Sequence, residues 1–181
     1  MKGANKGKKW IYVNEDNDSA RYVLGYSGDN PLICIGINPS TARPDDFDNT
    51  MKSVERIALN NGYDSFIMLN VYPIRSTVFE NLSKEENEYY RRRNKEEIKK
   101  CIQGMEGPLN VWLAFGNLVD KRTYMKDCMD DILKVLKEKE VRFWNAGRTK
   151  ADNPKHPLYL RKDTKLEEME ITEYLKRKQW I

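Results

Sequence analysis

The sequence predicts an α/β protein, a three-layer α/β/α sandwich around a central, mostly parallel sheet. Continuous apolar runs at 32–37, 66–71 and 109–115 are typical of strands that are buried on both faces. Stretches with helical periodicity separate these runs, and strands that alternate with helices indicate a sheet covered on both sides. A length of 181 residues suits one domain over 1–181.

The first expected strand covers 21–26, where aromatic and β-branched residues alternate with others, as in an edge strand or a hairpin arm. The turn signal SGDNP at 27–31 follows it. The three apolar runs then supply the buried strands, and a shorter candidate lies at 141–144.

Two helices are expected in the first half of the chain. One contains Met51, because apolar residues recur from there at helical spacing, and Asn61 with Gly62 forms its stop signal. The second begins at a capping box, SKEE at 83–86, and ends near Gly104.

Two more helices are expected in the second half. Asn117 is a candidate cap for a helix whose apolar face includes residues at 132–136. Another capping box, TKLE at 164–167, predicts a terminal helix that runs toward Leu175.

The charge of the chain does not by itself indicate a partner. There are 32 basic and 28 acidic residues, a net charge of +4, which is too small to show a nucleic-acid partner alone. Lysines gather in a basic arm over 1–10 and in a basic tail at 176–178, and solvated, flexible termini explain both.

Cysteine usage and hydropathy favour a cytoplasmic protein. Cys34, Cys101 and Cys128 have no metal-ligand spacing, which fits a reducing compartment. No stretch approaches the roughly 18 apolar residues of a membrane span. The first lysines are not followed by an apolar core, so we expect neither a signal peptide nor a membrane partner.

Polar residues and glycines follow three of the expected buried strands. Gly36, Ile37 and Asn38 lead from one strand into Pro39, Asn70 ends the next, and Gly116 follows a third. Ligands bind at the carboxyl ends of parallel strands, so these residues predict a site at one edge of the sheet. An asparagine before a proline is also a common turn residue, and that alternative stays open.

Several short motifs resemble an uncharacterised, largely bacterial domain family. They occur in the expected order, and the resemblance covers 20–162 without implying an activity. The motifs are NPSTA at 38–42, DDFDNT at 45–50, NVYP at 70–73, AFG at 114–116 and PKHPLYL at 154–160.

A more distant resemblance is to the uracil-DNA glycosylase superfamily. GINPS at 36–40 is similar to the GINPG of its mismatch-specific branch. NVYPIR at 70–75 and HPLYL at 156–160 are similar to motifs of its thermophile-type branch. The resemblance implies a uracil-DNA-glycosylase-like fold and an N-glycosylase-like hydrolase that acts on DNA or a nucleotide. For this chain we expect no cofactor and no metal.

The resemblance also implies roles for single residues. Glycosidic cleavage builds positive charge on the sugar and negative charge on the departing base. Asn38 would orient a water molecule and a neutral His156 would donate to the base, which makes these two the candidate catalytic residues. Asn70 carries a donor beside an acceptor, a match for the N3–H and O4 edge of uracil.

The candidate substrate-binding residues are drawn from the same motifs. An aromatic ring, Tyr72 or Phe47, would stack on the base, and the residues at 158–160 would form a wedge in a duplex. The full substrate-binding set is Gly36, Ile37, Pro39, Ser40, Thr41, Asn70, Tyr72, Gly116, Pro157 and Tyr159.

Departures from the glycosylase motifs leave two other functions open. Ser40 replaces a glycine, Leu158 replaces a serine, and three cysteines cannot hold the iron–sulphur cluster of the thermophile-type branch. One alternative is a binder of nucleic acid or nucleotides without catalysis. The other is a small-molecule enzyme, with a metal ion held by the aspartates at 45–48, although a solvated loop or helix cap explains those aspartates as well.

Overall fold

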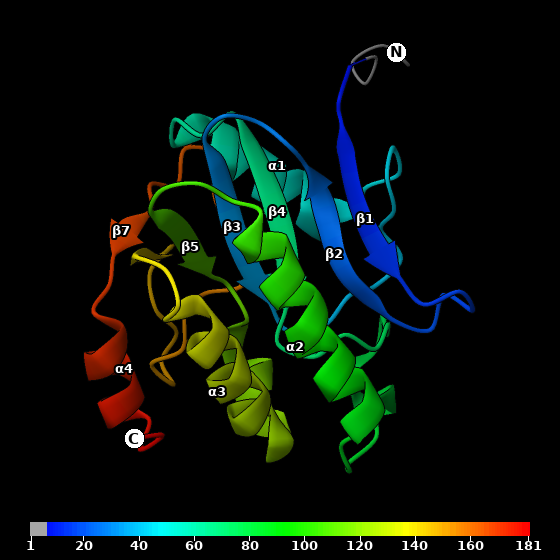
Figure 1. The fold of residues 1–181 in the computed structure, drawn as a ribbon. Helices are drawn as coiled ribbons and strands as arrows, with labels where there is room; N and C mark the ends of the chain where they lie inside the picture. The colour runs from blue at the N-terminus through cyan, green and yellow to red at the C-terminus, as the bar shows by residue number, and fades with distance from the viewer. Residues whose placement is uncertain (1–6) are drawn as a thin grey trace.

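The computed structural model describes residues 7–181 and shows a sheet between layers of helices (Figure 1). The strands are β1 (Trp10–Asn14), β2 (Arg21–Tyr26), β3 (Pro31–Gly36), β4 (Ser65–Asn70), β5 (Leu109–Leu113), β6 (Val141–Asn145) and β7 (Glu167–Glu168). The α-helices are α1 (Asn49–Asn60), α2 (Glu88–Gln103), α3 (Tyr124–Leu136) and α4 (Ile171–Arg177). Two short 3-10 helices are η1 (Phe79–Asn81) and η2 (Gly116–Lys121).

The strand order in the sheet is β1-β2-β4-β3-β5-β6-β7. β4, β3, β5 and β6 are parallel neighbours, whereas β1, β2 and β7 pair with their neighbours in antiparallel fashion. The predicted parallel sheet is therefore confirmed for its centre only. β2 is the expected hairpin arm but not an edge strand, because it lies between β1 and β4 and all six of its residues are buried.

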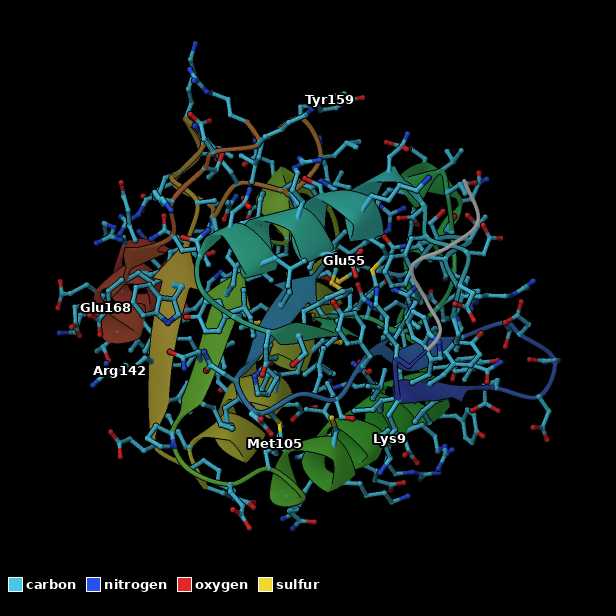
Figure 2. The ribbon with its side chains drawn as sticks, turned by 90° about the horizontal axis from the view of Figure 1, so that it is seen from above. Lys9, Glu55, Met105, Arg142, Tyr159 and Glu168 are labelled. Carbon is cyan, nitrogen blue, oxygen red and sulfur yellow. The ribbon has the colours of Figure 1, made fainter. Side chains whose placement is uncertain are left out.

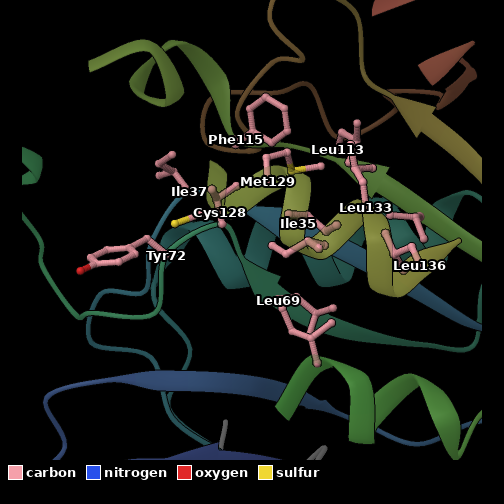
Figure 3. Packing of buried hydrophobic residues seen from close by; sticks show 14 of the residues in the cluster. Ile35, Ile37, Leu69, Tyr72, Leu113, Phe115, Cys128, Met129, Leu133 and Leu136 are labelled. Carbon is pink, nitrogen blue, oxygen red and sulfur yellow. The ribbon is translucent and has the colours of Figure 1, made fainter. Parts of the chain in front are cut away.

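The two faces of the sheet carry separate cores. On one face α1 packs Val54 and Ile57 against strand residues such as Phe66. On the other face α2 and α3 cover Ile35 and Leu69, and Figure 3 shows part of this second core. α1 lies behind the sheet in Figure 1 and α2 and α3 lie in front of it, so the arrangement is the expected three-layer α/β/α sandwich.

This topology has a switch point at β3. The chain runs from β3 through α1 to β4 on one side, and then returns through α2 to β5 on the other side of β3. In open α/β sheets a crevice forms outside the carboxyl ends of the strands at such a point. Gly36 and Asn70 end β3 and β4 there and are direct partners in the parallel ladder.

The amino-terminal strand β1 was not expected from the sequence. The predicted basic arm over 1–10 lies partly outside the described residues, which begin at Gly7. Within them, Lys8 pairs with Glu55 of α1 at 2.6 Å, and Trp10 already belongs to β1. The lysines of the arm obscured a short strand whose residues are all only partly buried.

The predicted ends are right for the first two helices, and the first contains Met51 as expected, but the predicted start of the second is wrong. α1 ends at Asn60 with Asn61 as its cap, and α2 ends just before Gly104. However, α2 begins at Glu88, where the Asn87 side chain accepts the backbone N–H groups of the first turn. Ser83 instead accepts the N–H of Glu85 in a local turn, a bond that competes with helix capping.

The predicted starts of the last two helices are wrong for the same reason. Asn117 lies in η2, where its Oδ1 accepts from Thr149, and α3 begins later, at Tyr124. Thr164 donates to the carbonyl of Arg161 in a turn. The residues after it form β7, so that α4 begins only at Ile171.

The three cysteines are free thiols with no nucleophilic role. Burial raises the pKa of Cys101 to about 11 and that of Cys128 to about 12, and it also raises the pKa of Cys34 well above its ordinary value. All three therefore stay protonated at neutral pH. Separately, none of the helices in residues 7–181 has the length and apolar character that a bilayer crossing needs.

Candidate functional site

A pocket of about 540 Å³ opens at the carboxyl ends of β3 and β4, beside the first turn of α1. This volume lies in the range of small-molecule sites. Loops that follow β4, β5 and β6 complete the wall. The lining residues are Arg21, Gly36, Ile37, Asn38, Pro39, Ser40, Asp48, Asn49, Thr50, Met51, Met68, Asn70, Ser76, Thr77, Phe79, Leu118, His156, Leu158 and Tyr159.

The structure brings most of the predicted site residues to this pocket, although they are far apart in the sequence. Both candidate catalytic residues line it. The predicted residues in the wall are Gly36, Ile37, Asn38, Pro39, Ser40, Asn70, His156 and Tyr159, whereas Thr41, Tyr72, Gly116 and Pro157 are not part of it.

Asn70 provides the most unusual group in the pocket. Its side chain is fully buried, yet neither Oδ1 nor Nδ2 has a hydrogen-bond partner among the described residues. Its backbone carbonyl accepts from Asn94 Nδ2 of α2 at 2.9 Å, which fixes the end of β4 from the other face of the sheet. A buried, unpaired amide costs about 1–3 kcal/mol, which makes this side chain a candidate ligand contact.

Gly36 leaves the space that Asn70 occupies. A Cβ at position 36 would lie 3.0 Å from Asn70 Oδ1 and 2.5 Å from Met68 Cε. The first contact is tight and the second needs the methionine to move. Glycine is therefore needed at this strand end because a side chain would collide with the pocket residues, and not because the backbone conformation requires it.

Asn38 is held in a fixed orientation. Its Nδ2 donates to the carbonyls of Pro39 and Ser76, at 3.1 and 3.0 Å. Its Oδ1 accepts no hydrogen bond among residues 7–181, and the residue lines the pocket. Because the amide nitrogen of Asn38 already donates to two carbonyls, the side-chain oxygen is the group that remains free to accept a hydrogen bond in the pocket.

His156 is neutral and has a defined tautomer. Its Nδ1 accepts the N–H of Leu158 at 3.1 Å, so the ring proton is on Nε2. Burial lowers the pKa of His156 from the usual 6.5, and the charge of Asp48 opposes this shift in part. The pocket therefore contains a neutral imidazole that can donate from Nε2.

Asp48 supplies a carboxylate that the sequence analysis did not assign to the site. Its Oδ1 accepts from the N–H of Met51 at 2.9 Å and caps α1. Its Oδ2 has no donor among the described residues, and the residue lines the pocket close enough to His156 to affect its pKa. The motif DDFDNT indicated that an acidic residue could lie near the site, but nothing in the motif distinguished Asp48 from the neighbouring aspartates.

Arg21 is the second residue that was missed. It opens β2, is 2% exposed and lines the pocket. A charged residue at the start of an otherwise apolar strand was the available signal. The strand pattern alone could not show that this residue is buried and lines a pocket instead of facing solvent.

Tyr72 is placed wrongly by the sequence analysis. It is buried on the α2–α3 face, where Figure 3 shows it beside Cys128, and its ring packs on Tyr124 at 5.0 Å. Its hydroxyl oxygen accepts from the N–H of Asn87. Phe47, the other candidate for stacking, packs edge-on against Phe66 instead of lining the pocket.

The other three unplaced residues support the wall from outside. Pro157 is buried and its carbonyl accepts from Ser53 of α1 at 2.8 Å. Gly116 has a φ of +65°, and a Cβ there would come within 3.2 Å of the Cβ of His156. Thr41 is exposed in the loop after Ser40. Gly116 and Pro157 thus position His156 and its loop without touching a ligand.

Tyr159 lies at the mouth of the pocket and points away from the molecule (Figure 2). It is 94% exposed and has a φ of +71°, which is strained for a bulky residue. An exposed ring in a strained backbone conformation is a common sign of a binding role. The expected wedge at 158–160 is thus reduced to this one side chain, because Leu158 and Leu160 are partly buried.

The aspartates at 45–48 do not form a metal site in the structure. Arg43 and Asp46 exchange two backbone hydrogen bonds in a tight turn, and Asp45 adopts a φ of +63° within it. Only Asp48 reaches the pocket. Within residues 7–181 there is no group of three or more His, Cys, Asp or Glu side chains that could hold a metal ion.

Comparison with known proteins gives one match. A family model described as a protein of unknown function, DUF1643, matches residues 21–158. The expected membership of an uncharacterised family is thus confirmed, and the match covers 21–158 of the expected 20–162. Neither the curated proteins nor the solved structures gave a match, so the likeness to uracil-DNA glycosylases stays a prediction.

Proposed function

The chain belongs to DUF1643, a family of proteins of unknown function, and we propose that it hydrolyses the N-glycosidic bond of a substrate with a nucleobase. The observation that carries this proposal is the unpaired, fully buried amide of Asn70 inside a pocket of about 540 Å³. A ligand that binds here must present a donor and an acceptor side by side, and the edge of a nucleobase does so.

The environment of Asn70 favours a selective contact. Because the amide has no competing protein partner, a ligand that pairs with both atoms removes the cost of their burial. A ligand that lacks one of the groups would leave a buried atom unpaired and bind much more weakly. Uracil fits this rule through its N3–H and O4, whereas cytosine presents the reverse pattern.

Three other pocket residues fit the chemistry of bond cleavage. The free oxygens of Asn38 and Asp48 can hold a water molecule and stabilise the positive charge on the sugar. As water attacks the sugar carbon, the bond to the base nitrogen breaks and its electron pair leaves with the base. His156 Nε2–H donates a hydrogen bond to the base, and Asp48 accepts the proton of the water.

The direct test is release of a free base. The purified protein is incubated with nucleosides, nucleotides, and single- and double-stranded DNA that contain uracil, hypoxanthine or the ordinary bases, and free base is separated and measured. We expect release by the wild type and loss in His156→Asn, which keeps an acceptor for the Leu158 N–H. A wild type that neither cleaves nor binds any of these substrates would contradict the proposal.

A second candidate, a nucleic-acid binder without catalysis, is favoured by the mouth of the pocket. Exposed Tyr159 lies in a loop region that is rich in basic residues. Such a surface suits stacking on a base beside a phosphate backbone. The basic residues are Arg148, Lys150, Lys155, Arg161, Lys162 and Lys165.

This candidate is tested by DNA binding at several salt concentrations. Tyr159→Gly removes the ring and suits the positive φ, so the variant should fold at least as well as the wild type. Binding that weakens with salt and with Tyr159→Gly, without any base release, would favour the binder over the hydrolase.

A further inference from the structure

Arg21 is a buried cation without a counter-ion. It is 2% exposed, its Nε has no partner, and its only side-chain hydrogen bond runs from Nη1 to the Ala42 carbonyl at 3.1 Å. No carboxylate within residues 7–181 lies within ion-pair distance of it. A buried, unpaired charge is costly, and proteins keep one only with a compensating group.

Three other shielded arginines differ from Arg21 in this respect. Arg91 pairs with Asp131 at 2.7 Å, Arg93 pairs with Glu97 at 2.9 Å, and Arg75 lies 3.2 Å from Asp18. Each of these guanidinium groups is less buried than Arg21 and still has a carboxylate. Arg56 also has no ion pair within the described part of the chain, but it is only partly buried and does not line the pocket, so among these arginines Arg21 alone combines full burial with a place in the pocket wall.

The surroundings of Arg21 increase the local positive charge. Arg75 donates to the same Ala42 carbonyl at 3.2 Å, which places two guanidinium groups beside one another. Burial and the charge of Arg75 lower the pKa of Arg21 to about 10, whereas the charges of Asp48 and Asp18 oppose this shift without forming an ion pair with it, so Arg21 remains charged at neutral pH. The first turn of α1 also lines the pocket and adds the positive end of the helix dipole.

Arg21 is close in the fold to the proposed base contact. Its backbone N–H donates to the Pro73 carbonyl at 3.0 Å, and Pro73 follows Asn70 by three positions. Both side chains line the same pocket, from neighbouring strands. One ligand can therefore meet the amide with its base and the guanidinium with an anionic group.

We propose that Arg21 binds the phosphate of the ligand, so that the substrate is a free nucleotide with a terminal phosphate. This inference rests on the proposed function for the base contact at Asn70. Arginine matches phosphate through several N–H donors at once. A phosphate within a DNA strand is joined to nucleotides on both sides, whereas only a terminal phosphate can enter a pocket as far as a 2% exposed side chain.

The test compares binding of matched ligands by calorimetry. The wild type is titrated with the 5′-monophosphates of deoxyuridine and the four ordinary deoxynucleosides, with the nucleosides themselves, with inorganic phosphate and with a short single-stranded oligonucleotide. We expect a monophosphate to bind at least about tenfold more tightly than its nucleoside. Arg21→Gln should abolish this difference and leave the affinity for the nucleoside unchanged.

Two further variants make the result specific. Arg92→Gln removes a positive charge of the same kind from a side chain of α2 that is 69% exposed and lies outside the pocket, and it should not change the preference for the monophosphate. Arg21→Lys keeps the charge but not the planar fork, so it should keep part of the preference. If Arg21→Gln fails to fold, the ratio of nucleoside to monophosphate affinity of the wild type still shows whether the protein has a phosphate site.

The outcomes separate this inference from the proposed function. Equal affinities for a nucleoside and its monophosphate, or no binding of any monophosphate, would overturn the phosphate site. Tighter, Arg21-dependent binding of the oligonucleotide than of every monophosphate would overturn the assignment to a free nucleotide. Arg21-dependent binding of monophosphates without release of a base would keep the phosphate site and contradict only the hydrolase.

Discussion

Gly36 and Asn70 face each other across the ladder of β3 and β4, and a Cβ at position 36 would come within 3.0 Å of Asn70 Oδ1. The two residues therefore form one unit, because the absence of a side chain at Gly36 leaves the space that the Asn70 side chain occupies. Four predictions follow from this unit and from the residues around it.

Gly36→Ala should weaken ligand binding more than it weakens the fold. The added methyl group displaces Met68 and presses on Asn70, which we expect to cost about 1–3 kcal/mol of unfolding free energy and to remove most of the affinity. Urea unfolding and calorimetry measure the two effects. Gly104→Ala is the matched control, because the nearest atom to its Cβ lies 3.8 Å away. Equal affinities of Gly36→Ala and the wild type would contradict the assigned role of Gly36.

Asn70→Leu should stabilise the protein and abolish binding. The change removes two buried polar atoms without partners, so we expect a gain of about 1 kcal/mol in unfolding free energy. Asn153→Leu provides the contrast. That asparagine is also fully buried, but its amide pairs with Asp120 at 2.6 Å and with Tyr174 at 3.0 Å, so its loss should cost about 2 kcal/mol or more.

The comparison of these two variants uses thermal and urea unfolding under the same conditions. If Asn70→Leu is as destabilising as Asn153→Leu, then the amide of Asn70 has partners in solution and is not available to a ligand.

The stability of the protein should depend on pH through His156. Burial depresses the pKa of this imidazole in the folded state, whereas the unfolded chain keeps a value near 6.5. Below that value the unfolded state binds more protons, so the contribution to stability falls as the pH drops and levels off below the folded pKa. Above pH 7 both states are neutral and the contribution is constant.

His156→Asn isolates this effect because the chain contains no other histidine. The difference in unfolding free energy between wild type and variant, measured by urea titration, should change between pH 7.5 and pH 5 in favour of the variant. A difference that stays constant over this range would show that the imidazole is not depressed by burial.

Asp48→Asn should leave α1 intact and change the chemistry of the pocket. Asparagine caps helices as well as aspartate, so we expect a cost of no more than about 0.5 kcal/mol. Because the charge of Asp48 raises the pKa of His156, its removal should lower that pKa further. NMR titration of the histidine measures this shift, and Asp163→Asn, which removes an exposed charge, should cause none. An unchanged pKa would place Asp48 too far from His156 to act with it.

The position of the site was predictable from the sequence. Asn38 and Asn70 follow apolar strands, and the carboxyl ends of parallel strands share one edge, which was enough to bring their side chains to one pocket. The sequence could not place Tyr72, because β4 ends at Asn70 and the alternation of faces is lost in the turn that follows. Burial of Arg21 depends on how α1 and its preceding loop cover the start of β2, and no local pattern encodes that arrangement.

The helix starts were mispredicted for a related reason. Ser83 and Thr164 form hydrogen bonds that satisfy neighbouring backbone groups within turns, and a capping box describes the same local chemistry. Whether the residue forms a turn or caps a helix depends on the direction in which the chain continues after it.

The side chain of Asn94 donates to the main-chain carbonyls of Asn70 and Val71. These bonds fix the position of the strand end independently of which side chain residue 70 carries. Asn94 reaches across from the α2 layer and contacts only carbonyl oxygens, so the end of β4 keeps its place whatever side chain residue 70 carries. Under the proposed function, a single replacement at residue 70 would therefore change the ligand preference without a rearrangement of the framework.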